Sequence, residues 1–279
     1  MPPRLIRIST ENAAFQHVDA LRRKRETRQK SREFLVEGVR NLNQALNYGW
    51  EMKSLLSCQD RDLSDWARSI LRTSGAALHA VVAPHLWERI SIRDNPSELL
   101  AIVTMPEDSL ARLPIHRDMC MVIFDRPASP GNLGALIRSC DAFRVDGLVI
   151  TGHATDLYDP LTVRASTGSF FAIPGVRLAS SRDLLPWLDD VTHRIGPCQI
   201  VGSSAKATLD VARHDFTGPT ILIIGNETWG MSAAYREMCD VIVTIPIAGS
   251  ATSLNVACAA SILLYEVDRQ RRERQLDGI

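Results

Sequence analysis

The stretch SPGNLGALIRSCDAF, residues 129–143, follows an apolar run at 120–124 and continues into a segment with the pattern of a helix. A strand, a glycine-containing turn and a helix in this order are typical of the junctions at which α/β proteins bind ligands. Asn132 is a candidate N-cap, and the glycines would admit a ligand close to the backbone. Because the segment lacks both a GxGxxG fingerprint and a Walker lysine, taken alone it favours an ordinary capped loop.

The same alternation continues to the end of the chain. Strands are expected at 120–124, 147–151, 199–203, 220–225 and 241–245, and helices at 132–145, 160–170, 181–190, 231–239 and 253–273. Strands that alternate with helices in this way predict an α/β fold with a mostly parallel sheet.

The first hundred residues form a second α/β pattern. Apolar runs at 54–58, 78–82 and 99–103 predict strands, and residues 12–30 and 37–48 predict helices, so here too we expect a mostly parallel sheet. A polar stretch with two prolines separates the two patterns. We therefore predict an N-terminal domain over residues 1–106, a linker over 107–117 and a C-terminal domain over 118–279.

The composition of the chain limits the class of protein further. The 279 residues are 45% hydrophobic and 23% charged, which is typical of a soluble globular protein. The six cysteines form no CxxC pair, so we expect no metal site. Because the start, MPPRLIRIST, has no apolar signal core and no apolar run approaches the roughly 20 residues of a membrane span, we expect a cytoplasmic protein with no membrane contact.

The charge is unevenly distributed although the formal net charge is +0. Residues 22–32, RRKRETRQKSR, carry seven basic side chains against one glutamate. Such a patch on a neutral protein suits a polyanionic partner. A solvated helix face is the commoner explanation of a lone charge run, by about two to one.

Two more loops follow predicted strands. The first continues an apolar run into Gly225-Asn226-Glu227, and its glutamate is as compatible with ligand binding as with capping a helix near Ser232. The second begins at Ile245-Pro246 and reaches Ser253-Leu254-Asn255 through small residues. Thr252 or Ser253 could cap the following helix, whose free N–H groups suit an anion.

Together these three segments resemble the SpoU (TrmH-like) branch of the SPOUT RNA methyltransferases. The motifs occur in the family's order: Asn132-x-Gly134-x-x-x-Arg138, Gly225-Asn226-Glu227-x-x-Gly230, and Ile245-Pro246 with Ser253-Leu254-Asn255. Residues 30–40, KSREFLVEGVR, resemble the start of the family's L30e-like substrate-binding domain. Residues 126–132 and 225–227 are most similar to the 23S rRNA methyltransferases of the avilamycin-resistance type.

The resemblance implies transfer of a methyl group from S-adenosylmethionine (SAM) to a ribose 2′-hydroxyl of RNA. It favours 23S rRNA and a link to resistance against a ribosome-targeting antibiotic. It also implies a homodimer and a deep trefoil knot in the parallel-sheet SPOUT domain. The alternation of strands and helices alone would have led to an unknotted Rossmann-like sheet, since knots are nearly absent among folds.

Individual roles also follow from the resemblance. Arg138 corresponds to the arginine at the target 2′-hydroxyl; because a guanidinium keeps its proton in proteins, we expect it to stabilise the developing alkoxide by charge. The polar residues around it would be Asn132, Glu227, Ser253 and Asn255. The residues at the cofactor would be Ile224, Gly225, Ile245, Ile247 and Leu254. The residues at the RNA would be Arg22, Arg23, Lys24, Arg25, Arg28, Lys30, Arg32 and Arg164.

Other functions compete with this one. The same reaction on tRNA is the nearest, although an N-terminal domain of this size favours rRNA. A non-catalytic RNA-binding or ribosome-assembly factor is the second, and the intact polar motif residues argue against it. A Rossmann oxidoreductase is the third and weakest, and titration with SAM and NADH would distinguish it.

Overall fold

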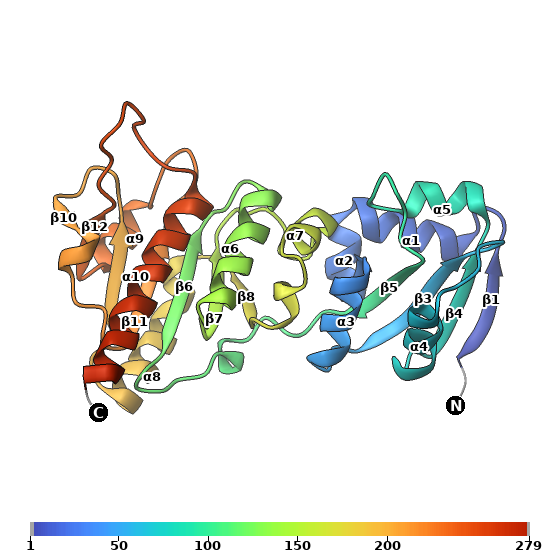
Figure 1. The fold of residues 1–279 in the computed structure, drawn as a ribbon, viewed down its shortest axis with the longest axis horizontal. Helices are drawn as coiled ribbons and strands as arrows, with labels where there is room; N and C mark the ends of the chain where they lie inside the picture. The colour runs from blue at the N-terminus through green and yellow to red at the C-terminus, as the bar shows by residue number, and fades with distance from the viewer. Residues whose placement is uncertain (1–2, 278–279) are drawn as a thin grey trace. The chain divides into compact units, whose positions relative to one another are not determined.

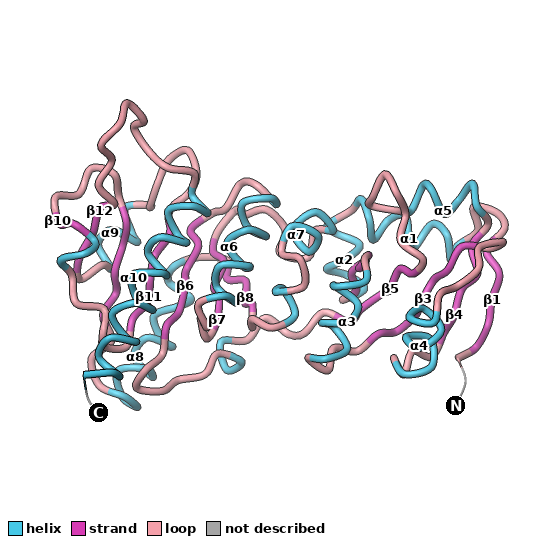
Figure 2. Tube along the Cα trace, viewed as in Figure 1, coloured by secondary structure: helices cyan, strands magenta, loops and turns pink. Residues whose placement is uncertain are grey.

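The computed structural model describes the fold of residues 3–277 and divides it into two compact units (Figures 1 and 2). The first unit contains the chain up to Pro106 together with Tyr158–Ala172, and the second contains Glu107–Leu157 and the residues from Ile173 on. The first unit therefore includes a segment from the middle of the chain. The predicted domain boundaries at 106 and 118 did not include this segment.

The first unit is built on a five-stranded sheet of order β1-β4-β3-β5-β2. The strands are β1 (Arg4–Ile8), β2 (Glu33–Glu37), β3 (Met52–Cys58), β4 (Leu78–Val82) and β5 (Leu99–Thr104). β4 runs parallel to β1 and β3, but β5 runs antiparallel to both β2 and β3. The prediction of a mostly parallel sheet is wrong for this unit. The direction of β5 is set by the path of the connection through α5 (Pro84–Ile90), which the pattern of apolar runs does not reveal.

Helices cover this sheet: α1 (Ala13–Arg23), α2 (Arg25–Ser31), α3 (Val39–Asn47), α4 (Asp65–Thr73), α5 and, from the middle of the chain, α7 (Pro160–Ala165). The single helix predicted over 12–30 is two helices, because Lys24 adopts an extended backbone. Beyond the break, Arg28 turns back and donates hydrogen bonds to the last carbonyls of α1, those of Leu21 (2.8 Å) and Arg22 (3.3 Å). The helix predicted over 160–170 ends at Ala165.

The second unit is built on a seven-stranded sheet of order β10-β12-β9-β11-β6-β7-β8, and every neighbouring pair is parallel, as predicted. The strands are β6 (Cys120–Asp125), β7 (Gly147–Thr151), β8 (Gly175–Leu178), β9 (Gln199–Ser203), β10 (Leu209–Asp210), β11 (Thr220–Ile224) and β12 (Val241–Thr244). Four of them, β12, β9, β11 and β6, are consecutive neighbours, so their carboxyl ends meet at one edge. The chain moves outward from β6 through β7 to β8 and then crosses to the other side, which makes β6 and β11 the switch point where open α/β sheets bind ligands.

Two pairs of helices pack on this sheet. α8 (Leu185–Ile195) and α9 (Ala233–Met238) bury Trp187, Val191 and Tyr235 in one cluster with side chains from the central strands. α6 (Pro130–Ala142) and α10 (Val256–Asp277) pack against each other in front of the sheet in Figure 1. Their contact includes the hydroxyls of Ser139 and Ser261, which lie 2.7 Å apart. Both α6 and α10 begin at the edge where the four carboxyl ends meet, so their first turns face the same place.

Candidate active site

The loop after β6 leads into helix α6, and the N-cap residue of this helix is not the predicted one. Ser129 occupies the N-cap of α6, and its hydroxyl oxygen accepts a hydrogen bond from the backbone N–H of Asn132 at 3.3 Å. The prediction that Asn132 caps this helix is therefore wrong. Because Pro130 fits the first helical position and Ser129 precedes it, the helix starts earlier than predicted. The Asn132 side chain is left available for other partners.

Asn132 joins two other loops through its side chain. The Glu227 carboxylate, after β11, accepts hydrogen bonds from Asn132 Nδ2 (3.2 Å) and from the backbone N–H groups of Ala128 (2.9 Å) and Ser129 (3.0 Å). The other end of the Asn132 amide, Oδ1, accepts a hydrogen bond from Asn255 Nδ2 at 3.0 Å. Glu227, Asn132 and Asn255 thus form one chain of contacts, here called the three-loop network. Glu227 caps the start of α6 and not a helix near Ser232.

Asn255 also fixes the start of α10. Its side-chain oxygen accepts hydrogen bonds from the backbone N–H groups of Ala257 (2.9 Å) and Cys258 (3.4 Å), and the helix begins at Val256. The predictions of a helix start at 253 and of a cap at Thr252 or Ser253 are wrong. Asparagine is among the strongest N-cap residues, and a cap of this kind contributes about 1 kcal/mol. One side chain therefore starts a helix and connects that helix to α6.

A cavity of about 430 Å³ lies beside the network, within the size range of small-molecule sites. All five residues predicted for the cofactor line it, and so do Glu227 and Ser253. The five are Ile224, Gly225, Ile245, Ile247 and Leu254. Gly225 is required by sterics, because a Cβ at this position would lie 2.3 Å from the backbone nitrogen of Met231. Four aliphatic side chains and a bare backbone make this wall suited to a flat, partly apolar ligand.

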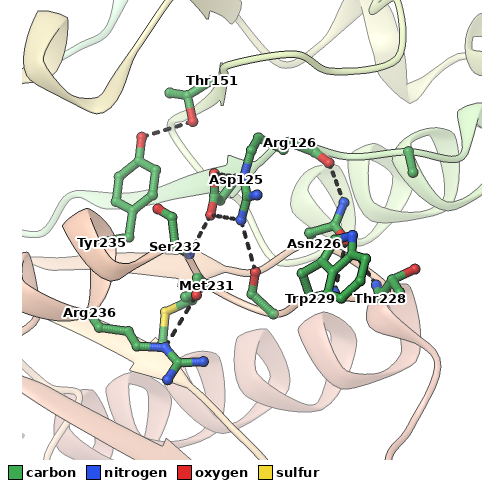
Figure 3. Close-up of polar contacts among 12 residues, drawn as sticks. Asp125, Arg126, Thr151, Asn226, Thr228, Trp229, Met231, Ser232, Tyr235 and Arg236 are labelled. Atoms are coloured by element: carbon green, nitrogen blue, oxygen red, sulfur yellow. Dashed lines mark hydrogen bonds and ion pairs between the residues drawn. The ribbon is translucent and has the colours of Figure 1, made fainter.

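The tight turn after β11 is fastened to the end of β6 by an ion pair that the sequence did not reveal. Asp125, only 2% exposed, accepts hydrogen bonds from Arg126 Nε (2.9 Å) and Nη2 (3.0 Å) and from the backbone N–H of Ser232 (2.7 Å) (Figure 3). Arg126 Nη2 also donates to the Gly230 carbonyl at 3.3 Å, and Asn226 Nδ2 donates to the Arg126 carbonyl at 2.7 Å. The Asp125 carboxylate raises the pKa of Arg126 above its ordinary value. The sequence offered one signal for this pair, namely polar residues directly after a buried strand.

Arg126 adopts a left-handed backbone with φ of 52°, which is uncommon for a residue other than glycine. The two bonds to Asp125 and the bond to Gly230 compensate for this conformation. Behind the pair, the Tyr235 hydroxyl donates to Thr151 Oγ1 at 2.9 Å, and burial raises the pKa of Tyr235 to about 12. Tyr235 therefore stays neutral and acts as a support for the β6 and β7 ends.

The remaining predicted site residues differ in their position relative to the cavity. Arg138 is exposed on α6, has no hydrogen-bond or ion-pair partner among the described residues, and does not line the cavity. It lies six residues beyond Asn132, about 9 Å along the helix axis. Asn132 and Asn255 are likewise outside the cavity lining, while Ser253 is exposed within it. The structure brings Asn132, Glu227 and Asn255 together and leaves Arg138 directed to solvent.

The basic residues predicted at the RNA differ in their exposure. Arg28 is only 2% exposed and pairs with Asp159 at 3.4 Å, so burial removes it from any phosphate contact and the prediction for it is wrong. Arg22 and Arg23 both lie within ion-pair distance of Asp19. The other predicted residues are at least partly exposed: Lys24, Arg25, Lys30, Arg32 and Arg164.

The described residues, 3–277, contain no group of three or more histidine, cysteine or acidic side chains that could hold a metal ion. In the same range, no helix is both long and apolar enough to cross a membrane.

Comparison with known proteins identifies the class of protein. Residues 119–265 match the SpoU rRNA Methylase family, and residues 12–101 match the SpoU L30e-like domain. The chain belongs to the SpoU rRNA methylase family, and the predicted resemblance is confirmed.

Individual relatives agree over nearly the whole chain. The 23S rRNA (uridine(2479)-2′-O)-methyltransferase of Streptomyces viridochromogenes is 46% identical, over 96% of this chain and 94% of that protein. The crystal structure of the SpoU methyltransferase AviRb from the same organism, in complex with AdoMet, superposes with a TM-score of 0.90 at 46% identity, covering 94% of this chain and 98% of that one. An AdoMet-bound rRNA methyltransferase from Sinorhizobium meliloti gives 0.83 at 30% identity, covering 95% and 98%.

Proposed function

We propose that this protein transfers a methyl group from SAM to a ribose 2′-hydroxyl of 23S rRNA. The observation that carries the proposal is the three-loop network beside the cavity. Glu227, Asn132 and Asn255 come from three family motifs far apart in the chain and are joined by hydrogen bonds of 3.2 and 3.0 Å. The relatives named for this reaction on 23S rRNA, and the one crystallised with AdoMet, support the substrate and the cofactor.

The cavity fits SAM by its chemistry. Ile224, Ile245, Ile247 and Leu254 would enclose the adenine, and the backbone at Gly225 would lie against the adenosine. When bound, SAM supplies a methyl group on a positively charged sulfur. The residues of the chain have to exclude water around it and to hold the ribose in line with it.

Glu227 holds the loops and does not take up the ribose proton. Its carboxylate already accepts three hydrogen bonds, from two backbone N–H groups and from Asn132, so it has little capacity left for a substrate hydroxyl. Asn132 is oriented by Glu227 on one side and by Asn255 on the other. Ser253, exposed in the cavity lining, is available to the substrate side.

Arg138 carries the charge that the reaction needs. The ribose oxygen gains negative charge as it gives up its proton, which an adjacent phosphate of the RNA would take, and a guanidinium stabilises that charge without giving up its own proton. The absence of any partner for Arg138 within the described residues leaves all its donors available for RNA.

Arg138→Lys tests this role, because lysine keeps the charge and loses the planar fork. We expect methyl transfer to fall by about tenfold or more, with SAM binding unchanged. Arg144→Lys, an exposed arginine just beyond α6, is the matched control. Full activity of Arg138→Lys would contradict the geometric part of the role.

The protein acts as a homodimer with a trefoil knot in its C-terminal domain. Exposed apolar side chains on α10, Ile262 (39%) and Tyr265 (50%), support a subunit contact at this helix. Family membership supports the knot. The two family matches, over residues 12–101 and 119–265, support two domains, and Tyr158–Ala172 packs with the first of them. RNA phosphates would contact Arg22, Arg23, Lys24, Arg25, Lys30, Arg32 and Arg164.

Mapping ribose methylation on 23S rRNA tests the function. Cells that carry the gene should show one additional 2′-O-methylated nucleotide compared with cells that lack it, and purified protein with SAM should restore the mark on unmodified 23S rRNA. Sensitivity of the two strains to antibiotics that bind the large ribosomal subunit tests the proposed resistance. Identical methylation maps would refute the proposed substrate.

A further inference from the structure

One large aromatic side chain at the cavity has no structural explanation in the network described above. Trp229 is 76% exposed, although it lines the cavity together with Glu227 and Gly225. Tryptophan is usually well buried because its side chain presents a large apolar area. Its exposure therefore leaves a flat apolar surface at the mouth of the candidate active site.

The backbone that carries Trp229 is held in place. Asn226 and Gly230 exchange two backbone hydrogen bonds, of 3.1 and 2.9 Å, so that residues 226–230 form a closed turn. The Asn226 side-chain oxygen accepts from the backbone N–H groups of Thr228 (2.9 Å) and Trp229 (3.0 Å). Arg126 fastens the base of the turn through Asn226 and Gly230 (Figure 3). Trp229 is thus presented on a rigid turn.

Two cations line the cavity together with Trp229. Lys206 and Arg236 are exposed and line the same cavity, and Arg236 is held by a 3.2 Å hydrogen bond from its Nε to the Met231 carbonyl. Among the described residues that line the cavity, Glu227 is the one acid, and its carboxylate is occupied by the start of α6. An exposed indole and two cations that line one cavity have the composition of a site for single-stranded nucleic acid, in which bases stack on aromatic rings and phosphates contact cations.

We propose that Trp229 is a specificity-determining residue that stacks on an unpaired base of the substrate RNA, next to the nucleotide that is methylated, while Lys206 and Arg236 contact the flanking phosphates. This proposal rests on the proposed function, because it takes RNA as the substrate. Stacking would hold the strand at the cavity mouth and would contribute to RNA binding more than to the chemical step. Trp229 is then the residue that admits unpaired RNA and disfavours duplex RNA, whose bases are already stacked.

Steady-state kinetics on 23S rRNA test this. Stacking of one base is worth about 5- to 150-fold in affinity, so Trp229→Ala should raise the KM for RNA at least fivefold, with a smaller change in kcat and an unchanged Kd for SAM. Trp229→Phe should recover part of the loss, since phenylalanine keeps an aromatic face. Leu276→Ala, which removes another exposed apolar side chain, on α10 and outside the cavity lining, should have wild-type kinetics.

A binding experiment separates this proposal from the proposed function. The protein has five tryptophans, so the signal of Trp229 is the difference in fluorescence between wild type and Trp229→Phe. Adding a single-stranded oligoribonucleotide should quench the fluorescence of Trp229 and so reduce that difference, whether or not methyl transfer occurs. A wild-type KM for Trp229→Ala with no quenching would overturn the proposal. Two other results for Trp229→Ala would also overturn it. A loss of SAM affinity equal to the loss in RNA affinity would show that the indole contacts the cofactor. Dissociation of an oligomer would show that the indole contacts a second subunit. Absence of methyl transfer by the wild-type protein would instead refute the proposed function.

Discussion

The three-loop network and the basic segment over residues 22–32 behave in opposite ways. The network residues are 95 and 123 positions apart in the chain, and the fold brings their side chains into contact. The basic residues are adjacent in the chain, and the fold gives them different surroundings: the helix breaks at Lys24, Arg28 is buried, and Arg22 and Arg23 lie within ion-pair distance of Asp19. Residues that cluster in the sequence therefore need not cluster in space.

The reason is the geometry of each element. Parallel strands place their carboxyl ends at one edge, so polar residues that follow β6, β11 and β12 meet whatever their separation in the chain. A run of charges on helices is distributed around the helix axis instead, at about 100° per residue, and one of its members can point into the core. The four predictions below test this difference, in order of decreasing effect.

Gly225→Ala should have the largest effect. A Cβ would overlap backbone atoms of Met231 (2.3 Å) and Gly230 (2.4 Å), which cannot yield as a flexible side chain does. We expect SAM binding to be lost and the free energy of unfolding to fall by about 2 kcal/mol or more, measured by calorimetric titration and urea denaturation. Gly218→Ala, with no atom within 4 Å of its Cβ, should stay within about 0.5 kcal/mol of wild type. Equal behaviour of the two variants would show that the turn after β11 is not tightly packed.

Glu227→Gln should reduce methyl transfer by about 10- to 100-fold, because the amide nitrogen of glutamine cannot accept the N–H groups of Ala128 or Ser129 and an unmet donor costs about 1–3 kcal/mol. The measurement is kcat/KM with labelled SAM and 23S rRNA. Glu237→Gln, an exposed acid on α9 with no partner in the described residues, should be unaffected. Loss of activity in both variants would point to a general charge effect.

Arg28→Ala should act on stability. It removes the hydrogen bonds to the Leu21 and Arg22 carbonyls and the ion pair with Asp159 at 3.4 Å, so we expect the free energy of unfolding to fall by about 2 kcal/mol. Lys30→Ala, at an exposed position on the same helix, should change it by less than about 0.5 kcal/mol. An RNA-binding defect in a fully stable Arg28→Ala protein would restore Arg28 to the RNA surface.

The double variant Lys24→Ala/Lys30→Ala should have the smallest effect, confined to RNA affinity. Neither lysine side chain has a hydrogen-bond or ion-pair partner within residues 3–277. Each phosphate contact removed should lower the slope of log Kd against log salt by about 0.7–0.9, so the double variant should lower it by about 1.4–1.8. Arg4→Ala/Arg7→Ala removes the same charge from exposed positions of β1 and should leave the slope unchanged. Equal slopes for both variants would remove the segment from the RNA interface.

The parallel sheet and the cavity wall could be predicted because apolar strands and motif residues leave a direct trace in the sequence. Strands β6, β7, β9, β11 and β12 lie within a residue of their predicted bounds. The short strands β1 (RLIRI) and β8 (GVRL) were missed because charges interrupt them. The antiparallel direction of β5 was missed because strand direction depends on the connection and not on composition.

Hydrogen-bond partners could not be predicted. Asn132 was expected to cap a helix, and Ser129 does so; the proline after Ser129 marked the true helix start, but the hydrogen bonds of Asn132 to two other loops left no trace in the sequence. Two charged residues at the end of a buried strand marked the Asp125–Arg126 pair, but the sequence did not show its partner, a turn about 100 residues later in the chain.

A double-mutant cycle tests the central claim, that the three-loop network acts as one unit in methyl transfer. Asn132→Ala, Glu227→Ala and the double variant are compared by kcat/KM on 23S rRNA. We predict that the double variant is little worse than the more damaged single variant, with a coupling of about 1 kcal/mol or more, since each change removes one partner of the same 3.2 Å hydrogen bond. Losses that simply multiply would show that the two residues act independently and would contradict the account.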